Sequence, residues 1–369
     1  MDQSKRLEEF EKLVYTKFNI YNSLFLNLPY SKKSNIGMLI PLLHDTCRQG
    51  LESGQDPLEI LDSFFHNYVN LKAEKDKIDF MFKVIQYVER QVVLYDSVED
   101  AAFPNLQELG NDLSIKNFFQ LLESKKSSDR IAEKLSSFSA RIVFTAHPTQ
   151  FYPPSVLDII TRLSPLIADN KIDEIDMSLQ QLGLTSLINA KKPTPLDEAR
   201  NIIYYLRNVF YNAVGDLYSY IKENIRSDDF DNPDIIKLGF WPGGDRDGNP
   251  FVTSYITRDV ADELRMTLMK CYYNDLKILQ KRLTFREVED TLNDLRGRVY
   301  KTIFNPAYIV SFEEIINPLI AVREIVVNKY HNLYLKNLDN LIDKVNIFKT
   351  HFATLDIRQD HSIHKQVIE

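Results

Sequence analysis

Glycine is the residue that most limits what this chain can fold into. Only 11 of its 369 residues are glycine, less than half of the usual share of about 7%. A chain with so little glycine has few tight turns, so we expect it to be rich in helices. Four of the glycines lie within residues 239–248, together with the only tryptophan, Trp241. The backbone of this window must therefore adopt conformations or close approaches that other residues do not allow.

The composition excludes several classes of protein. Apolar residues make up 44% of the chain, which is enough for a folded core and argues against disorder. The net charge of −7 and the lack of a long basic run argue against nucleic acid or a membrane surface as the partner. Two cysteines, Cys47 and Cys271, cannot form a disulfide framework, which fits the cytoplasm. We expect neither a signal peptide nor a membrane span.

Two kinds of spacing predict the secondary structure. Apolar residues recur every three or four positions in three segments, which predicts helices at 203–221, 260–279 and 322–345. Thr257 is the expected N-cap of the second of these helices. Short β-branched or aromatic segments interrupt this pattern and predict buried strands at 142–145, 235–240 and 352–357.

Each predicted strand runs directly into a polar cluster, at 145–150, 243–250 and 356–360. Polar groups at the carboxyl ends of strands that helices separate are typical of a β/α-barrel active site. The strands are too far apart for simple βα units, and three strands cannot close a barrel. We therefore expect a predominantly α-helical fragment of a TIM-type barrel, with about three strands and large helical insertions. The expected division is a helical region, 1–138, and the strands with their insertions, 139–369.

A histidine and an arginine in these clusters are candidate site residues. His147 precedes Pro148, which favours extended backbone and presents the imidazole at a strand end. The alternative is that this histidine is structural. Arg358 ends an apolar strand, where a buried guanidinium needs an anionic partner. A salt bridge to Asp356 or Asp360 would explain it without any function.

The loop at 243–250 reads GGDRDGNP. Its glycines permit positive φ and close approach, and an arginine between two aspartates is charge-balanced and can be oriented. The candidate substrate-binding or site-shaping residues are Gly243, Gly244, Asp245, Arg246, Asp247 and Asn249. The alternative is an elaborate structural loop. A calcium loop fits poorly, because its sixth and twelfth positions would be Pro250 and Ile256 instead of glycine and glutamate.

Four segments carry a resemblance to a known family. They read FTAHPTQ at 144–150, KPTP at 192–195, GFWPGGDRDGNPFVT at 239–253 and LDIRQ at 355–359. In this order they resemble successive signature segments of the phosphoenolpyruvate carboxylase family. The likeness runs through the whole chain and is loosest over its first 130 residues. Because members of the family are much longer, the chain resembles only their N-terminal portion.

The resemblance implies a carboxy-lyase that forms oxaloacetate and phosphate from phosphoenolpyruvate and bicarbonate, and so fixes carbon dioxide for the tricarboxylic acid cycle. It implies a cytoplasmic homotetramer with Mg²⁺ or Mn²⁺, whose ligands come from the missing C-terminal half and not from this chain. It also implies that His147 is the base that deprotonates carboxyphosphate and that Arg358 binds phosphate oxygens. Arg246, Asp245 and Asp247 would shape the floor of the site. The chain alone is expected to be inactive.

The chain departs from the family pattern where many members bind activating sugar phosphates. Pro153 and Pro154 replace one pair of arginines, and Asn189 and Ala190 replace another. Ile363 replaces a further arginine after the DIRQ segment. We therefore expect no response to glucose 6-phosphate. A competing interpretation is a non-catalytic helical module for phosphate binding or assembly, and a calcium-binding helical protein is a third.

Overall fold

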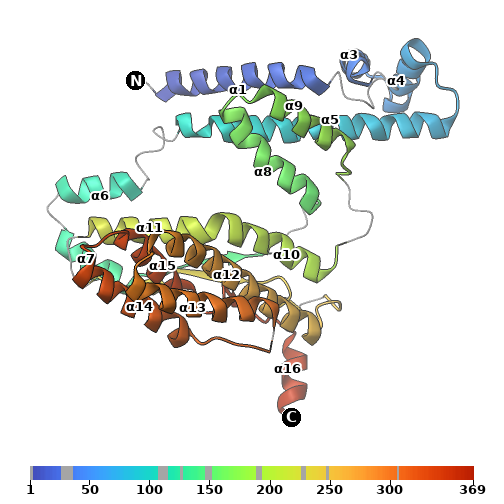
Figure 1. Cartoon of the computed structure of the whole chain (residues 1–369). Coiled ribbons are helices and arrows are strands. Elements are labelled where there is room, and N and C mark those ends of the chain that lie inside the picture. Colours follow the sequence, from blue (N-terminus) through green and yellow to red (C-terminus); the bar gives the residue numbers. More distant parts are fainter. Residues whose placement is uncertain are drawn as a thin grey trace. The chain divides into compact units, whose positions relative to one another are not determined.

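The computed structural model describes residues 3–25, 36–106, 115–124, 128–145, 152–187, 193–225, 230–246, 249–305 and 307–369. This part of the chain is mostly helical and contains one parallel sheet of three strands (Figure 1). It divides into two compact units, Met1–Asn117 with Tyr152–Lys191, and Phe118–Phe151 with Lys192–Glu369. The expected regions 1–138 and 139–369 remain a prediction. The compact units differ from them because two helices that follow residue 139 pack with the N-terminal helices.

The first unit is built around one long helix, α5, along which α1 and α8 pack. Its interior is apolar, and Phe25, Phe64, Leu94 and Leu163 are completely buried. Its elements are α1 (Gln3–Phe25), α3 (Ile36–Glu52), α4 (Pro57–Phe64), the π-turn η1 (Phe65–Val69), α5 (Glu74–Ala102), the 3₁₀ turn η2 (Phe103–Leu106), α8 (Pro154–Ala168) and α9 (Ile172–Leu184). A further helix, α6 (Ile115–Ser124), spans the residue boundary between the two units.

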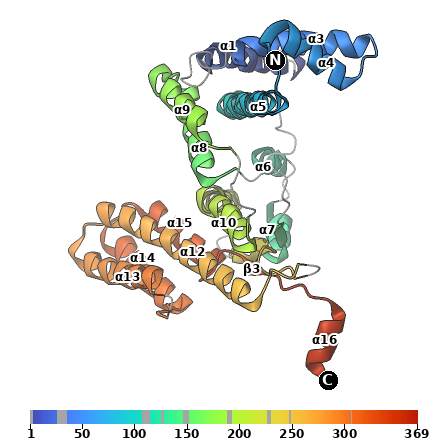
Figure 2. The ribbon, with the colours of Figure 1, turned by 90° about the vertical axis from the view of Figure 1, so that its right-hand side faces the viewer.

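The second unit contains the sheet and a group of long helices. These are α7 (Ser128–Ser137), α10 (Pro195–Tyr205), the π-turn η4 (Leu206–Phe210), α11 (Tyr211–Asn224), the 3₁₀ turn η5 (Pro233–Ile235), α12 (Ser254–Arg282), α13 (Arg286–Phe304), α14 (Phe312–Lys329), α15 (Leu335–Phe348) and α16 (His361–Ile368). The last helix extends away from the rest of its unit (Figure 2) and is exposed along its whole length.

The predicted helices are confirmed, with two corrections. Helix α12 begins after Thr253, whose side chain accepts a hydrogen bond from the backbone of Ile256, so the prediction of Thr257 as N-cap was wrong. The segment predicted as one helix over 322–345 is two helices. Between α14 and α15, residues including His331 and Tyr334 have positive φ, which ends the first helix.

The three predicted strands are present as β1 (Ala140–Phe144), β2 (Ile236–Phe240) and β3 (Thr354–Leu355), the last being only two residues long. The expected burial was wrong for β1, whose three central residues are exposed. They are parallel and lie in the order β1-β2-β3. Within the described residues, β1 and β3 each pair on one side only. The sheet therefore has two edges to which this part of the chain supplies no further strand.

The two faces of this sheet differ. On one face, Leu238 and Phe240 are buried under the helices. The ring of Phe144 on this face meets that of Phe210 edge-on, with 4.7 Å between the centroids. On the other face, Arg141 and Lys237 lie next to each other in register and both are exposed. Helices of this unit thus bury β2 on one face of the sheet, although Ile142 of β1 on the same face is 43% exposed.

Candidate functional site

The glycine-rich loop and the segment after β3 are joined by their backbones at the carboxyl ends of the strands. The Arg246 N–H donates to the Arg358 carbonyl, and the Arg358 N–H donates to the Gly244 carbonyl, both at 2.9 Å. The Trp241 N–H donates to the carbonyl of Phe144 at the end of β1, also at 2.9 Å. Two of the predicted polar clusters therefore lie together at one end of the sheet.

Two glycines of the loop are required by their surroundings. Gly243 has φ of 79°, and a Cβ there would lie 2.5 Å from Cγ2 of Val260. A Cβ on Gly244 would lie 2.2 Å from the carbonyl oxygen of Asp356. The expected positive φ is confirmed at Gly243 and the expected close backbone approach at Gly244. A backbone carbonyl, unlike a side chain, cannot rotate away from an added Cβ.

Arg358 is fixed in place by a carboxylate and an aromatic ring. Its Nη1 donates to Oδ2 of Asp245 at 3.1 Å, and its guanidinium carbon lies 4.3 Å from the centre of the Trp241 ring. The side chain is 43% exposed, so it is not the buried arginine that was expected. Its partner is Asp245 instead of Asp356 or Asp360. The guanidinium is oriented on two sides and still reaches solvent, as a binding group for an anion must.

Asp356 links the strand ends through its two carboxylate oxygens. Oδ1 accepts from Nη2 of Arg141 at 2.5 Å, and Oδ2 accepts from Nε1 of Trp241 at 3.1 Å. The sequence analysis did not assign Arg141 to the site. Its signal was an arginine inside an otherwise apolar strand, on the exposed face of β1. Arg141 and Asp356 thereby hold the ring against which Arg358 is stacked.

The other described residues of the loop hold its shape. Nη2 of Arg246 donates to Oγ1 of Thr257 at 2.9 Å, and that hydroxyl donates to the Gly243 carbonyl at 2.8 Å. The buried Nε of Arg246 has no hydrogen-bond partner among the described residues. Oδ1 of Asn249 accepts from the Phe251 N–H at 3.1 Å. Arg246 and Asn249 thus stabilise the turn that leads into α12.

Some of the predicted residues cannot be placed. His147 and Asp247 lie outside the described residues, as do Asn189 and Ala190. Among the residues that are described, no three His, Cys, Asp or Glu side chains form a group that could hold a metal ion. The carboxylate of Asp245, the first ligand of the calcium alternative, is paired with Arg358.

A second polar cluster lies in the helical core of the same unit. Nζ of Lys344 donates to Oδ2 of Asp275 at 3.2 Å and lies 4.4 Å from the centre of the Tyr211 ring, whose hydroxyl donates to the same carboxylate at 2.7 Å. Burial and the Asp275 charge raise the pKa of Tyr211 well above its usual value. Burial raises the pKa of the neighbouring Cys271 thiol to about 12. Tyr211 and Cys271 therefore stay protonated near neutral pH. The contacts of Lys344, Asp275 and Tyr211 bind α11, α12 and α15 together.

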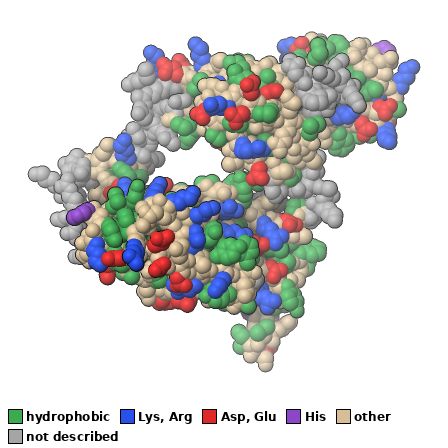
Figure 3. Space-filling view, viewed as in Figure 1, with side chains coloured by type: hydrophobic (Ala, Val, Ile, Leu, Met, Phe, Trp, Pro, Cys, Tyr) green, Lys and Arg blue, Asp and Glu red, His purple; other side chains and the backbone are tan. Residues whose placement is uncertain are grey.

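Figure 3 shows charged side chains of the described residues on one face of the molecule. There, Lys and Arg side chains lie among Asp, Glu and apolar ones. Across the described residues, no helix is both long and apolar enough to cross a membrane.

Comparison with known proteins identifies the family. The model of the phosphoenolpyruvate carboxylase family matches residues 78–305, which is more than half of the chain. The chain belongs to this family. Proteins named phosphoenolpyruvate carboxylase from Shewanella sediminis and Aeromonas salmonicida are 27% and 24% identical to it, each over 295 residues. These alignments cover 68% of the chain, and the chain spans only about a third, 34%, of the length of these relatives.

Proposed function

We propose that the chain contributes the N-terminal part of a phosphoenolpyruvate carboxylase, which converts phosphoenolpyruvate and bicarbonate to oxaloacetate and phosphate. The observation that carries this proposal is the junction between the glycine-rich loop and the DIRQ segment. Both resemble family signatures, and the hydrogen bonds between Arg246, Arg358 and Gly244 hold them side by side at the strand ends. Strand ends are where a barrel of parallel strands carries its chemistry.

The sheet supports the proposal that these strands belong to a TIM-type barrel. Parallel sheets are normally covered on both faces. Here the helices bury Leu238 and Phe240 of β2 on one face, whereas Arg141 and Lys237 on the other face are exposed. In a barrel, the helices lie outside and the bare face becomes the interior. The remaining strands would come from the part of the family's length that the chain does not span.

In this proposal Arg358 binds phosphate oxygens. Asp245 and Trp241 set the plane and position of its guanidinium, so little conformational freedom is lost when an anion binds. Asp356 and Arg141 act one step further away, by holding Trp241. Glycines 243 and 244 let the loop approach closely enough for these contacts.

The proposed base is His147. Transfer of the phosphoryl group to bicarbonate leaves the enolate of pyruvate and carboxyphosphate. Removal of the carboxyphosphate proton by His147 would release carbon dioxide and phosphate, and the enolate carbon would then attack the carbon dioxide to give oxaloacetate. Its place in the sequence, in the polar segment 145–150 that follows β1, supports the assignment.

The described residues do not fit the divalent metal that the family implies. No group of three potential ligands exists among them, and both carboxylates nearest the strand ends, Asp245 and Asp356, are paired with arginines. We propose that the ligands for Mg²⁺ or Mn²⁺ belong to the remainder of the family's length. The cytoplasmic location and the tetrameric state are likewise proposals from the family.

The competing function is a non-catalytic helical module for phosphate binding or assembly. The test is to express the chain with whatever sequence follows it in its gene and to measure oxaloacetate by reduction to malate. We expect activity there and none from the 369-residue chain alone. A gene product that lacks activity would favour the module.

The matched variants are Arg358→Gln and Arg200→Gln in the active protein. Both arginines are about half exposed and paired with a carboxylate, Arg200 with Glu263. Loss of one preorganised donor for the transition state lowers kcat by about 10²–10³-fold, so we expect this loss for Arg358→Gln only. Equal activities of the two variants would exclude Arg358 from the site.

A further inference from the structure

The long helix α5 carries apolar residues on two of its sides. One set, which includes Phe80, Val84 and Leu94, is buried in the first unit. A second set recurs every three or four residues, and each member is between 41% and 55% exposed: Ile78, Phe82, Ile85, Val88, Val92 and Tyr95. This spacing places the second set on one face of the helix, about 26 Å long at 1.5 Å per residue. We call it the exposed face of α5.

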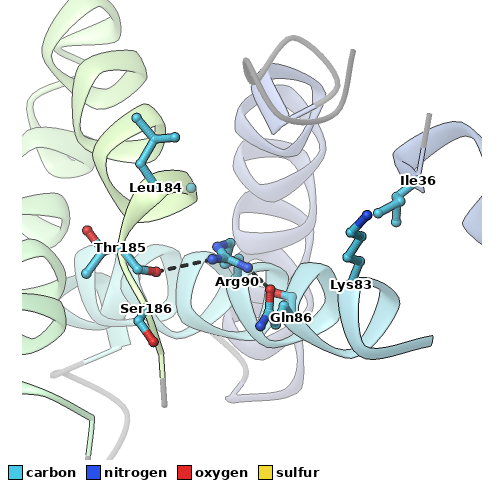
Figure 4. Close-up of a pocket in the computed structure, with 8 residues that line it drawn as sticks. Ile36, Lys83, Gln86, Arg90, Leu184, Thr185 and Ser186 are labelled. Atoms are coloured by element: carbon cyan, nitrogen blue, oxygen red, sulfur yellow. Dashed lines mark hydrogen bonds between the residues drawn. The ribbon is translucent and has the colours of Figure 1, made fainter. Parts of the chain in front are cut away.

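Other sides of α5 are occupied by the rest of the first unit. Figure 2, which looks along α5, shows α1 on one side of this helix and α8 on another, and both pack against it. Arg90 projects towards the segment that follows α9 (Figure 4), where its Nη2 donates to the Thr185 carbonyl at 3.1 Å. Among the described residues of this unit, no helix covers Ile85 and Val92 on the exposed face.

The exposed face begins at an apolar groove. A cavity of about 490 Å³ lies between α4 with η1 and the first part of α5. Leu58 and Phe65 line it from one side, and Ile78, Phe82 and Ile85 line it from the other. A groove that continues into a face of helical spacing suits an amphipathic helix, whose side chains at i, i+3, i+4 and i+7 pack into it.

The charges along the exposed face are negative. Glu89 lies four residues after Ile85, and Asp96 lies four residues after Val92, so both share the side of the exposed set. Oε2 of Glu89 is buried and has no hydrogen-bond partner among the described residues. Burial and the charges of two acidic residues that follow it raise the pKa of Asp96. A cation beside these carboxylates would stabilise their charged form.

A second copy of this chain would fit the exposed face poorly. It would bring the same two carboxylates, and like charges that oppose each other across an interface weaken binding. Lys77, at the beginning of the face, is already paired with Asp62 at 2.5 Å. The charge of the face therefore favours a basic partner.

We propose that the exposed face of α5 binds an amphipathic helix of a partner protein that carries Lys or Arg beside its apolar stripe. The apolar side chains of this helix pack into the groove and along Val88 and Val92, and its cations lie against Glu89 and Asp96. Because the groove and the face belong to one compact unit, the site is complete within that unit. It does not involve Arg358, so it stands apart from the proposed carboxylase function.

The test is to titrate labelled model peptides of about 18 residues, long enough to span the face, with the 369-residue chain and to measure fluorescence anisotropy. The first peptide has leucine at heptad positions a and d, with lysines beside them. The second replaces every lysine by glutamate, and the third spreads the leucines of the first around the helix. We expect the first to bind at least about tenfold more tightly than either of the others, because the second is repelled and the third has no apolar stripe.

The decisive variant is Ile85→Lys, which places a positive charge at the centre of the face. Ile85 is 50% exposed, so the lysine can reach solvent. The first peptide should bind this variant at least about tenfold more weakly, because the change removes an apolar contact and repels its lysines. The matched control is Ile278→Lys, since Ile278 is 48% exposed and lies on α12 in the other unit. Its affinity should stay within about twofold of the unaltered chain.

The double variant Glu89→Gln and Asp96→Asn tests the charge of the face without changing its shape. The advantage of the first peptide over the second should fall at least about threefold, because two ion pairs are lost. An unchanged advantage would show that the lysines contact another part of the chain and would contradict the proposal.

Three further results would overturn the proposal. One is the absence of binding of the first peptide up to a millimolar concentration. Another is an equal affinity of the Ile85→Lys and Ile278→Lys variants. The third is a dimer of the unaltered chain in sedimentation equilibrium that only Ile85→Lys separates, because a second copy would then be the occupant. Circular dichroism with unchanged helix content ensures that a loss of binding is not a loss of fold.

Discussion

Replacing Gly244 by alanine tests whether the loop and the DIRQ segment are joined as described. The added Cβ would lie 2.2 Å from the carbonyl oxygen of Asp356, so the two backbones must separate by about 1 Å to reach an ordinary contact. That shift breaks or lengthens the hydrogen bonds between Gly244, Arg246 and Arg358. Overpacking costs about 1–3 kcal/mol and each lost bond about 0.5–1.5 kcal/mol. We expect the free energy of unfolding to fall by about 2–4 kcal/mol.

The assay is urea unfolding followed by tryptophan fluorescence. Trp241 is the only tryptophan of the chain and lies within this junction, so its emission reports the unit that contains the loop. At a typical slope of about 2–3 kcal/mol per molar urea, the midpoint should fall by about 1 M. Gly297→Ala is the control, since a Cβ there would meet no described atom within 4 Å other than its chain neighbours and the nearby backbone of its own helix, α13. This change should stabilise the unit by about 0.5–1 kcal/mol.

We therefore expect the replacement of glycine by alanine to lower the free energy of unfolding at position 244 and to raise it at position 297. If Gly244→Ala shifted the midpoint by less than about 0.2 M, the close approach of the two backbones would be refuted. A loss as large in Gly297→Ala would show that the assay responds to any added methyl group.

Three further outcomes are expected. In the active protein, His147→Asn should lower oxaloacetate formation by about 10²–10⁴-fold while some bicarbonate-dependent phosphate release survives; a parallel fall of both products would assign His147 to the first step. Glucose 6-phosphate should leave the KM for phosphoenolpyruvate unchanged, because Pro153 offers no guanidinium, and a severalfold decrease would contradict this. Lys344→Met should lower the free energy of unfolding by about 1–3 kcal/mol, because it removes the buried cation that pairs with the partly buried Asp275; a loss below about 0.5 kcal/mol in urea unfolding would disprove that role.

The sequence predicted those parts of the fold and site that depend on local pattern. The β-branched run that ends at Phe144 and the run that ends at Phe240 are strands, as their composition indicates. The clustering of glycines correctly marked a loop with a positive φ at Gly243 and a close approach at Gly244. These features follow from the intrinsic preferences of the residues concerned.

The parts that the sequence did not predict depend on contacts between distant segments. Thr257 has the residue type of an N-cap, but its hydroxyl binds the Gly243 carbonyl and the side chain of Arg246, so it lies inside α12. Arg358 has two carboxylates close in sequence, yet it pairs with Asp245, which the parallel bridge brings beside it. The sequence around Arg358 does not show that its partner is the distant Asp245 instead of Asp356 or Asp360, which are nearer in the chain.

The bare face of the sheet has a consequence for synthesis. A ribosome releases the chain from its N-terminus, so β1, β2 and β3 can fold before any sequence that follows them is made. A nascent sheet with open edges can recruit strands from other chains. Arg141 and Lys237 lie next to each other in register on the uncovered face, and charges in such positions oppose the stacking of a second sheet. These charges oppose face-to-face stacking of two nascent sheets, whereas the edges formed by β1 and β3 stay open to pairing.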